Sequence, residues 1–211
     1  MRLLILFKIT GLVAMFFLAI FFLSSCAANY KMINPRGVNY QANSNDENVF
    51  FSYKYNVLEE SGNKKYAKKE RKKNLSVVAV KLVNNKTVPI KFAEDVKIYS
   101  GNEIVLPVES EIVKNELKQI APLYLLYSLL WVTIYDCDSN GFDCSVTPIP
   151  VGLAIGLGNM AVAGSANQNF LRELMANDIL HREIQPGETV YGLIGVKDTG
   201  YNPLEFRFVG H

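Results

Sequence analysis

Residues 49–57 read VFFSYKYNV, and this stretch indicates the fold class of the chain. Its odd-numbered positions hold Val, Phe, Tyr, Tyr and Val, which are residue types enriched in β-strands. An alternation with a period of two residues is typical of a strand that buries one face. The stretch therefore predicts a β-strand, and we expect ordered structure to begin near Asn48.

Further strand-like runs follow this stretch at short intervals. They occupy residues 75–83, 88–92, 96–99 and 103–107, and turn-forming Asn, Asp and Gly residues separate them. The pattern stops near Glu109 and resumes at Ile184, with predicted strands at 189–196 and 204–208. Short strands separated in this way by turn signals are typical of a β-sandwich.

The order of these runs also resembles a known type of domain. A proline-flanked strand at 88–92, the turn QPGE at 185–188 and an alternating last strand are similar to small immunoglobulin-like domains of bacterial lipoproteins. The resemblance implies an antiparallel immunoglobulin-like β-sandwich built from residues 48–109 and 184–211. With the segment 110–183 inserted as helices, the predicted fold class is α+β. The resemblance implies a fold and no activity.

The first 26 residues predict export. A basic start is followed by an apolar run over residues 9–23 and by the sequence LSSC at 23–26. These last four residues resemble the lipobox of bacterial lipoproteins, which implies a signal peptide at 1–25 and a lipid on Cys26. The apolar run is shorter than a membrane-spanning helix requires. An ordinary cleaved signal and an uncleaved membrane helix are the alternatives.

A lipid on Cys26 would attach the protein to a membrane of the cell envelope. The next residue is Ala27 and not Asp, and the sorting rule of many Gram-negative lipoproteins then favours the outer membrane, with the protein facing the periplasm or the surface. Residues 26–47 are rich in Asn, Ser, Gln, Gly and Pro without a period. They are predicted to form a flexible tether between lipid and domain.

The charges of the mature chain balance. The sequence has 22 basic and 20 acidic residues, and two of the basic ones lie in the predicted signal peptide. A neutral, exported protein is not expected to bind nucleic acid. A basic run at 64–73 leaves two interpretations open, a solvated hairpin loop or a surface attracted to anionic lipid.

The inserted segment is unusually apolar, since residues 119–135 and 144–171 contain no charged side chain. They predict the two arms of a glycine-rich α-helical hairpin. Small residues spaced four apart let a second backbone approach closely. The hairpin could pack internally, insert into or lie on the membrane, or mediate self-association or contact with a protein partner through residues 119–170. The candidate contact residues are Leu126, Leu130, Trp131, Gly152, Gly156 and Gly158.

Cys137 and Cys144 flank the polar loop of this hairpin. In an exported protein they are candidates for a disulfide, and two reduced thiols are the alternative.

The polar loop also carries a weak metal-binding pattern. Its oxygen-bearing candidates are Asp136, Asp138, Asn140 and Asp143, in a spacing similar to a calcium loop. Thr147 occupies the position that should supply a bidentate glutamate. A solvated turn is therefore the preferred interpretation, and no metal site is predicted.

Catalytic patterns are sparse. The two histidines, His181 and His211, have no Cys or His partner at the spacing of a zinc site. We expect no catalytic residue and no cofactor, and therefore a non-enzymatic structural or interaction module. The alternative is a subunit of an oligomeric envelope channel or secretion assembly that contacts the membrane through the hairpin. A pocket that brings His181 near a carboxylate would keep the enzyme hypothesis open.

Overall fold

The computed structural model describes residues 26–40, 42–46, 48–137, 144–197 and 200–210. The predicted signal peptide, residues 1–25, lies outside the described residues. The chain forms two compact units. Residues 26–28 and 121–163 form what we call the hairpin unit, and residues 29–120 and 164–210 form the sheet unit. The fold class is α+β with several antiparallel sheets, as predicted.

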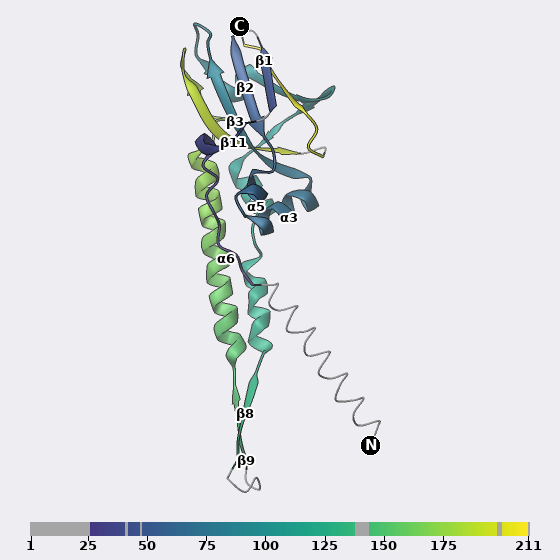
Figure 1. Cartoon of the computed structure of the whole chain (residues 1–211), viewed down its shortest axis with the longest axis vertical. Helices are drawn as coiled ribbons and strands as arrows, with labels where there is room; N and C mark the ends of the chain where they lie inside the picture. The colour runs from purple at the N-terminus through teal and green to yellow at the C-terminus, as the bar shows by residue number, and fades with distance from the viewer. Residues whose placement is uncertain (1–25, 41, 47, 138–143, 198–199, 211) are drawn as a thin grey trace. The chain divides into compact units, whose positions relative to one another are not determined.

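The sheet unit contains two larger sheets and one small one. The first has the strand order β1 (Ala42–Asp46), β2 (Val49–Lys54), β3 (Leu75–Asn84), β11 (Thr189–Lys197) and β7 (Pro107–Val108). The second has the order β12 (Leu204–Phe208), β5 (Val96–Ser100) and β6 (Glu103–Val105). The strands β10 (Glu183–Ile184) and β4 (Ile90–Lys91) form a separate pair. Figure 1 shows β1, β2, β3 and β11 side by side.

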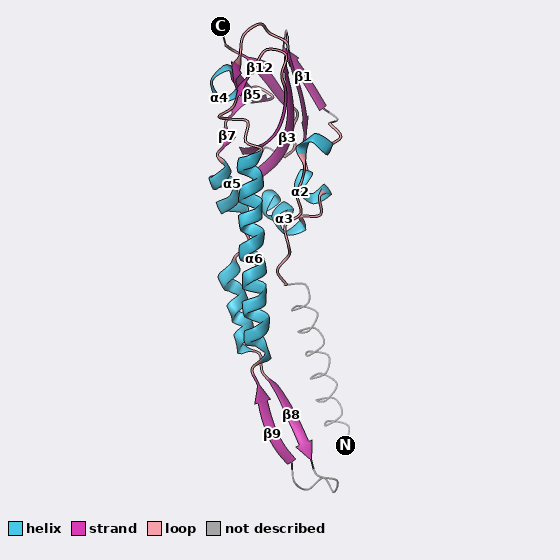
Figure 2. Cartoon of the chain, turned by 90° about the vertical axis from the view of Figure 1, so that its left-hand side faces the viewer, coloured by secondary structure: helices cyan, strands magenta, loops and turns pink. Residues whose placement is uncertain are grey.

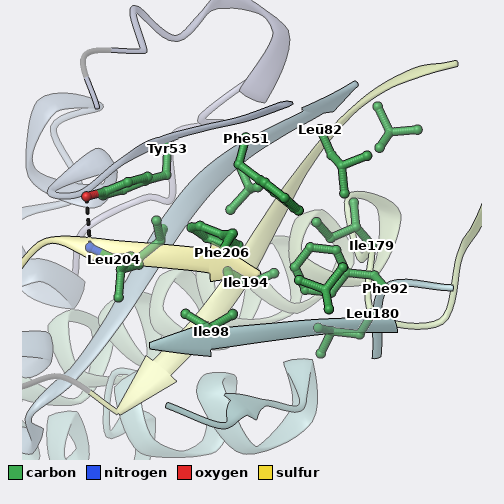
Figure 3. Packing of buried hydrophobic residues seen from close by; sticks show 14 of the residues in the cluster. Phe51, Tyr53, Leu82, Phe92, Ile98, Ile179, Leu180, Ile194, Leu204 and Phe206 are labelled. Atoms are coloured by element: carbon green, nitrogen blue, oxygen red, sulfur yellow. Dashed lines mark hydrogen bonds between the residues drawn. The ribbon is translucent and has the colours of Figure 1, made fainter. Parts of the chain in front are cut away.

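A hydrophobic core lies between the five-stranded and three-stranded sheets. Phe51 of β2 stacks on Phe206 of β12 with 4.9 Å between the ring centroids. Tyr53 of β2 accepts a hydrogen bond from the backbone N–H of Leu204 at 2.8 Å, and this bond ties the two sheets together (Figure 3). The alternating positions that the sequence predicted to face one side, such as Val80 of β3, lie in or against this core, except Val57. The strand that begins at Val49 ends at Lys54 and not at Val57 as predicted, and Val57 lies in a second core.

A second core covers the opposite face of β3. The residues that pack there come from α3 (Lys64–Lys73), α5 (Ser110–Leu117) and the last turns of α6 (Val151–Ala176). Tyr66 and Phe170 are its largest fully buried side chains from helices. Both faces of β3 are therefore buried, which explains why this strand is almost continuously apolar.

The basic run forms a helix and not the solvated hairpin loop that was one of its two interpretations. The helix α3 follows the short α2 (Val57–Glu60). It buries Tyr66, Ala67 and Glu70, while its lysines point outward. Lys, Arg, Glu and Ala are strong helix formers, and Asn74 ends the helix in a left-handed conformation, φ 49°. A narrow buried stripe is thus enough to anchor a helix that is otherwise charged.

The predicted tether is part of the folded sheet unit from residue 29 onward. Tyr30 and Ile33 are buried in the second core, and a short 3-10 turn follows at Pro35–Gly37. The polar strand β1 pairs with β2, and Ser44 accepts the backbone N–H of Phe206 at 3.0 Å. Backbone pairing stabilises a strand whose composition resembles a linker, so ordered structure begins earlier than composition indicated.

The hairpin unit differs from the expected helical hairpin at its tip. It contains the 3-10 helix η2 (Ala121–Leu129), the strands β8 (Val132–Cys137) and β9 (Cys144–Ile149), and the first half of α6. Figure 2 shows β8 and β9 as an antiparallel pair. Val, Thr and Ile favour strands here, and Pro148 and Pro150 cannot lie inside a helix without losing a hydrogen bond. The expected second helix therefore begins only at Val151.

Candidate functional site

Gly152 and Gly156, two of the small residues spaced four apart, bring α6 against η2 inside the hairpin unit. A Cβ atom on Gly152 would lie 1.7 Å from the carbonyl oxygen of Tyr127, and one on Gly156 would lie 2.8 Å from that of Tyr124. The N–H of Gly152 also donates to the carbonyl of Leu130 at 3.0 Å. The backbone contact predicted from the spacing is therefore made within the chain. A Cβ atom on Gly158 would meet nothing within 4 Å.

A small core holds these two segments together. Tyr124 and Tyr127 stack with 6.4 Å between their ring centroids, and Ala163 of α6 completes the cluster. Ala27 packs against the same cluster, and its backbone N–H donates to Oδ1 of Asn159 at 2.7 Å. The residue that follows Cys26 is thus held on α6, and Cys26 itself is exposed.

The rest of the unit presents large apolar side chains on its surface. Trp131 is 60% exposed, Leu126 is 61% exposed and Leu129 is 75% exposed. The others of this kind are Leu123, Leu125, Val132, Ile134, Tyr135, Val146, Ile149, Leu153, Ile155 and Leu157. Asp136 is the only charged residue among the described residues of the unit. Large exposed apolar surfaces mark sites that bind proteins or membranes.

The strands β8 and β9 are exposed on both faces along their whole length. An isolated two-stranded hairpin is marginally stable in water, and its outer edges carry backbone groups without a ladder partner. A disulfide joins Cys137 to Cys144 across the end of the pair, as the sequence predicted. Asp136, from the weak calcium pattern, is exposed on β8, whereas Asp138, Asn140 and Asp143 lie outside the described residues.

A pocket in the sheet unit surrounds His181. It is lined by Glu109, Ser110, Glu111, Ile112, Met175, Asp178 and His181. Nδ1 of the imidazole lies 3.1 Å from Oδ2 of Asp178, and Nε2 lies 3.6 Å from Oε1 of Glu109. The hydrogen bond with Asp178 and the charge of Glu109 raise the pKa of His181 above its usual value. The fold thus brings His181 near Glu109, which is distant in sequence, as well as near its neighbour Asp178.

This cluster supplies the donor atoms of a cation site, since one ligand atom from each of the three residues lies within 4.8 Å of the others. Both ring nitrogens already face carboxylates, however, and the His181 side chain is 67% exposed. That geometry suits an imidazolium bridging two carboxylates better than a general base, which needs one nitrogen directed at a substrate. Sequence reasoning missed Glu109 and Ser110, because no local pattern connects them to His181.

The helix α3 and the end of α5 form a basic surface on the sheet unit. Partial burial, followed by the charges of Lys73, Lys118 and Lys72, lowers the pKa of Lys69. Glu116 pairs with Lys73 at 2.9 Å, and this pairing lowers the pKa of Glu116. The lysines therefore lie close enough together to lower the pKa of Lys69, although Glu116 pairs with Lys73 and Glu59 pairs with Arg71.

No helix within the described ranges has the length and apolar composition needed to cross a membrane. Comparison of the chain with protein-family models, curated proteins and solved structures finds no match.

Proposed function

We propose that this protein is a lipid-anchored lipoprotein of the bacterial envelope that acts as a non-enzymatic structural or interaction module. Its body is an immunoglobulin-like β-sandwich, and its contact element is the hairpin unit. The observation that carries the proposal is the set of exposed apolar side chains, Trp131 among them, in a unit whose described residues include a single charged one, Asp136.

The immunoglobulin-like assignment is supported by the packing of two antiparallel sheets over one core. The inner positions of β2 and β3 face those of β5 and β12 across that core. The chain returns to the five-stranded sheet through β11 after the insertion, and β11 pairs with β3 from Thr189 to Lys197. The pairing of β11 with β3 supports the view that the inserted segment lies between two strands of one sandwich.

The lipid anchor is supported by the LSSC motif and by the surroundings of Cys26. Cys26 is exposed, and the backbone N–H of the next residue, Ala27, donates to Asn159. The residue Ala27 after the cysteine favours the outer membrane.

Two measurements test this proposal. Metabolic labelling with a palmitate analogue should mark the wild-type protein and not Cys26→Ala. Replacing residues 121–163 by a short Gly-Ser linker keeps Gln119 and Asn167, whose mutual hydrogen bonds of 2.8 Å close the base of the insertion. That variant should keep the label and the fold of the sheet unit. An unlabelled wild-type protein would overturn the lipoprotein assignment.

A second candidate is a subunit of an oligomeric envelope channel or secretion assembly. The observation that favours it is the β8–β9 pair, whose faces and edges are both available for pairing with another chain. Gly152 and Gly156 do not support it, because their close contacts are made inside the chain. The mass of the detergent-solubilised protein separates the candidates. A ring that disappears on replacing residues 131–150 supports the assembly, whereas a strict monomer overturns it.

A further inference from the structure

We infer that the hairpin unit lies in the interfacial layer of the membrane that holds Cys26, so that lipid covers its apolar surface. The inference rests on the proposed lipid anchor and names the partner of the contact element.

The position of the anchor is the first argument. Ala27 donates its N–H to Oδ1 of Asn159 and packs on the cluster of Tyr124 and Tyr127. Consecutive Cα atoms are about 3.8 Å apart, so Cys26 leaves the surface of the hairpin unit itself. Acyl chains on Cys26 would therefore enter the bilayer beside this unit.

The distribution of apolar residues is the second argument. Exposed apolar side chains come from every element of the unit, for example Leu126 of η2, Ile134 of β8, Val146 of β9 and Leu153 of α6. A protein partner usually covers a limited patch that a polar rim surrounds. Lipid can cover a surface that is apolar on several sides. Among the described residues of the unit Asp136 is the only charged one, which lowers the cost of placing that part of the unit in lipid.

The aromatic residues and the strand edges indicate how deeply the hairpin unit lies in the membrane. Trp131 and Tyr135 are 60% and 68% exposed, and amphipathic rings of this kind favour the headgroup level. The outer edges of β8 and β9 carry backbone polar groups, which would be costly in the hydrocarbon interior. Both features place the unit at the boundary between headgroups and acyl chains.

Trp131 is the only tryptophan of the chain, so its fluorescence reports on the hairpin unit alone. The probe is the mature chain with Cys26→Ala, mixed with vesicles of phosphatidylethanolamine and phosphatidylglycerol. We expect the protein to sediment with the vesicles and its emission to shift to shorter wavelength. Lipids brominated near the headgroup should quench it more strongly than lipids brominated near the chain end. The reverse order of quenching overturns the proposed depth.

A matched pair of variants locates the contact. Ile134 in the hairpin unit is 50% exposed and Ile104 in the sheet unit is 56% exposed, so neither substitution by Lys disturbs a core. Ile134→Lys should weaken vesicle binding at least about tenfold, whereas Ile104→Lys should leave it unchanged. Equal effects of the two substitutions on vesicle binding overturn the inference. Binding that requires phosphatidylglycerol and is unchanged by Ile134→Lys also overturns it, and assigns the binding to the basic surface of α3.

The outcomes also separate this inference from the proposed function. If the wild-type protein takes the palmitate label but its Cys26→Ala form does not bind vesicles, the proposed membrane position of the hairpin unit is wrong. The lipoprotein assignment is unaffected by that result. Photocrosslinking from position 131 in cells should then give a protein adduct. A lipid adduct from the same position is the result that the inference predicts.

Discussion

The carboxylate of Glu173 accepts the backbone N–H of Ile33 at 2.7 Å, although 140 residues separate the two. The same side chain accepts the hydroxyl of Tyr30 and the N–H of Asn34 at 3.3 Å, and it is 5% exposed. One buried carboxylate on α6 thus binds the segment that follows the proposed anchor. Burial and the hydrogen bond with Glu173 raise the pKa of Tyr30 far above its usual value, so the Tyr30 hydroxyl keeps its proton.

Replacing Glu173 should destabilise the sheet unit strongly. Glu173→Leu removes the acceptor of three donors and leaves them buried, which costs about 2–4 kcal/mol. Glu173→Gln keeps one acceptor oxygen and should cost roughly half as much. Urea unfolding measures both, with the exposed Glu111→Gln as a control. A Glu173→Leu protein as stable as the control would show that the segment around Ile33 adds nothing to stability.

Asn167 should be equally important at the base of the insertion. Its Oδ1 accepts the N–H of Gln119 at 2.8 Å and the hydroxyl of Tyr66 at 3.0 Å, and its Nδ2 donates to the carbonyl of Gln119. Asn167→Leu should lower the free energy of unfolding by about 2–3 kcal/mol because these buried groups lose their partner. The exposed neighbour Gln168→Ala is the control. Indistinguishable unfolding curves for the two variants would show that the hydrogen bonds of Asn167 do not contribute to stability.

The two classes of glycine in α6 should respond in opposite ways. Gly152→Ala forces a methyl group toward the carbonyl of Tyr127 and should separate α6 from η2, whereas Gly158→Ala meets open space. Alanine is favoured over glycine in a helix by about 1 kcal/mol, so Gly158→Ala should be neutral or stabilising. Limited proteolysis of the hairpin unit compares them. Similar cleavage rates for both variants would argue against the close contact at Gly152.

The bridge at His181 should contribute stability that depends on pH. Its pKa is raised in the folded state by Asp178 and Glu109, so the contribution is complete below the unfolded pKa of about 6.5. It is lost as the pH rises through the folded pKa. Glu111, which lines the same pocket, adds a further acidic group nearby. The difference in unfolding free energy between the wild type and His181→Gln should therefore shrink from pH 6 to pH 9, roughly over the range of histidine titration.

Urea unfolding at several pH values measures this difference, and NMR titration of the imidazole gives its pKa directly. A difference that grows toward alkaline pH, or a pKa below the usual value, would contradict the bridge. Because His181 is exposed, added salt should reduce the effect.

Much of the fold was predictable from local patterns. The alternation around Phe51, Val80 and Phe206 predicted which faces of β2, β3 and β12 are buried, because a strand repeats every two residues. The disulfide was also predictable, since an exported chain with two cysteines close together favours it. The helix α3 was missed because its buried stripe consists of only three residues within a run of lysines.

The candidate sites were only partly predictable. The exposed surface around Leu126 and Trp131 follows from the absence of charge, whereas Gly152 and Gly156 turned out to contact η2. The strands β8 and β9 were missed because short apolar runs fit a helix or a strand equally well. In the structure the two runs form strands that pair with each other, and a disulfide closes the end of the pair.

The sequence by itself determined the alternating sheet faces, the LSSC motif before Ala27 and the two uncharged stretches, because each depends on neighbouring residues alone. Only the tertiary structure decided that Glu173 binds the segment around Ile33, that Asn159 holds Ala27 and that Glu109 faces His181. These partners lie far apart in the chain. Their meeting depends on how sheets and helices pack, which no local window of sequence encodes.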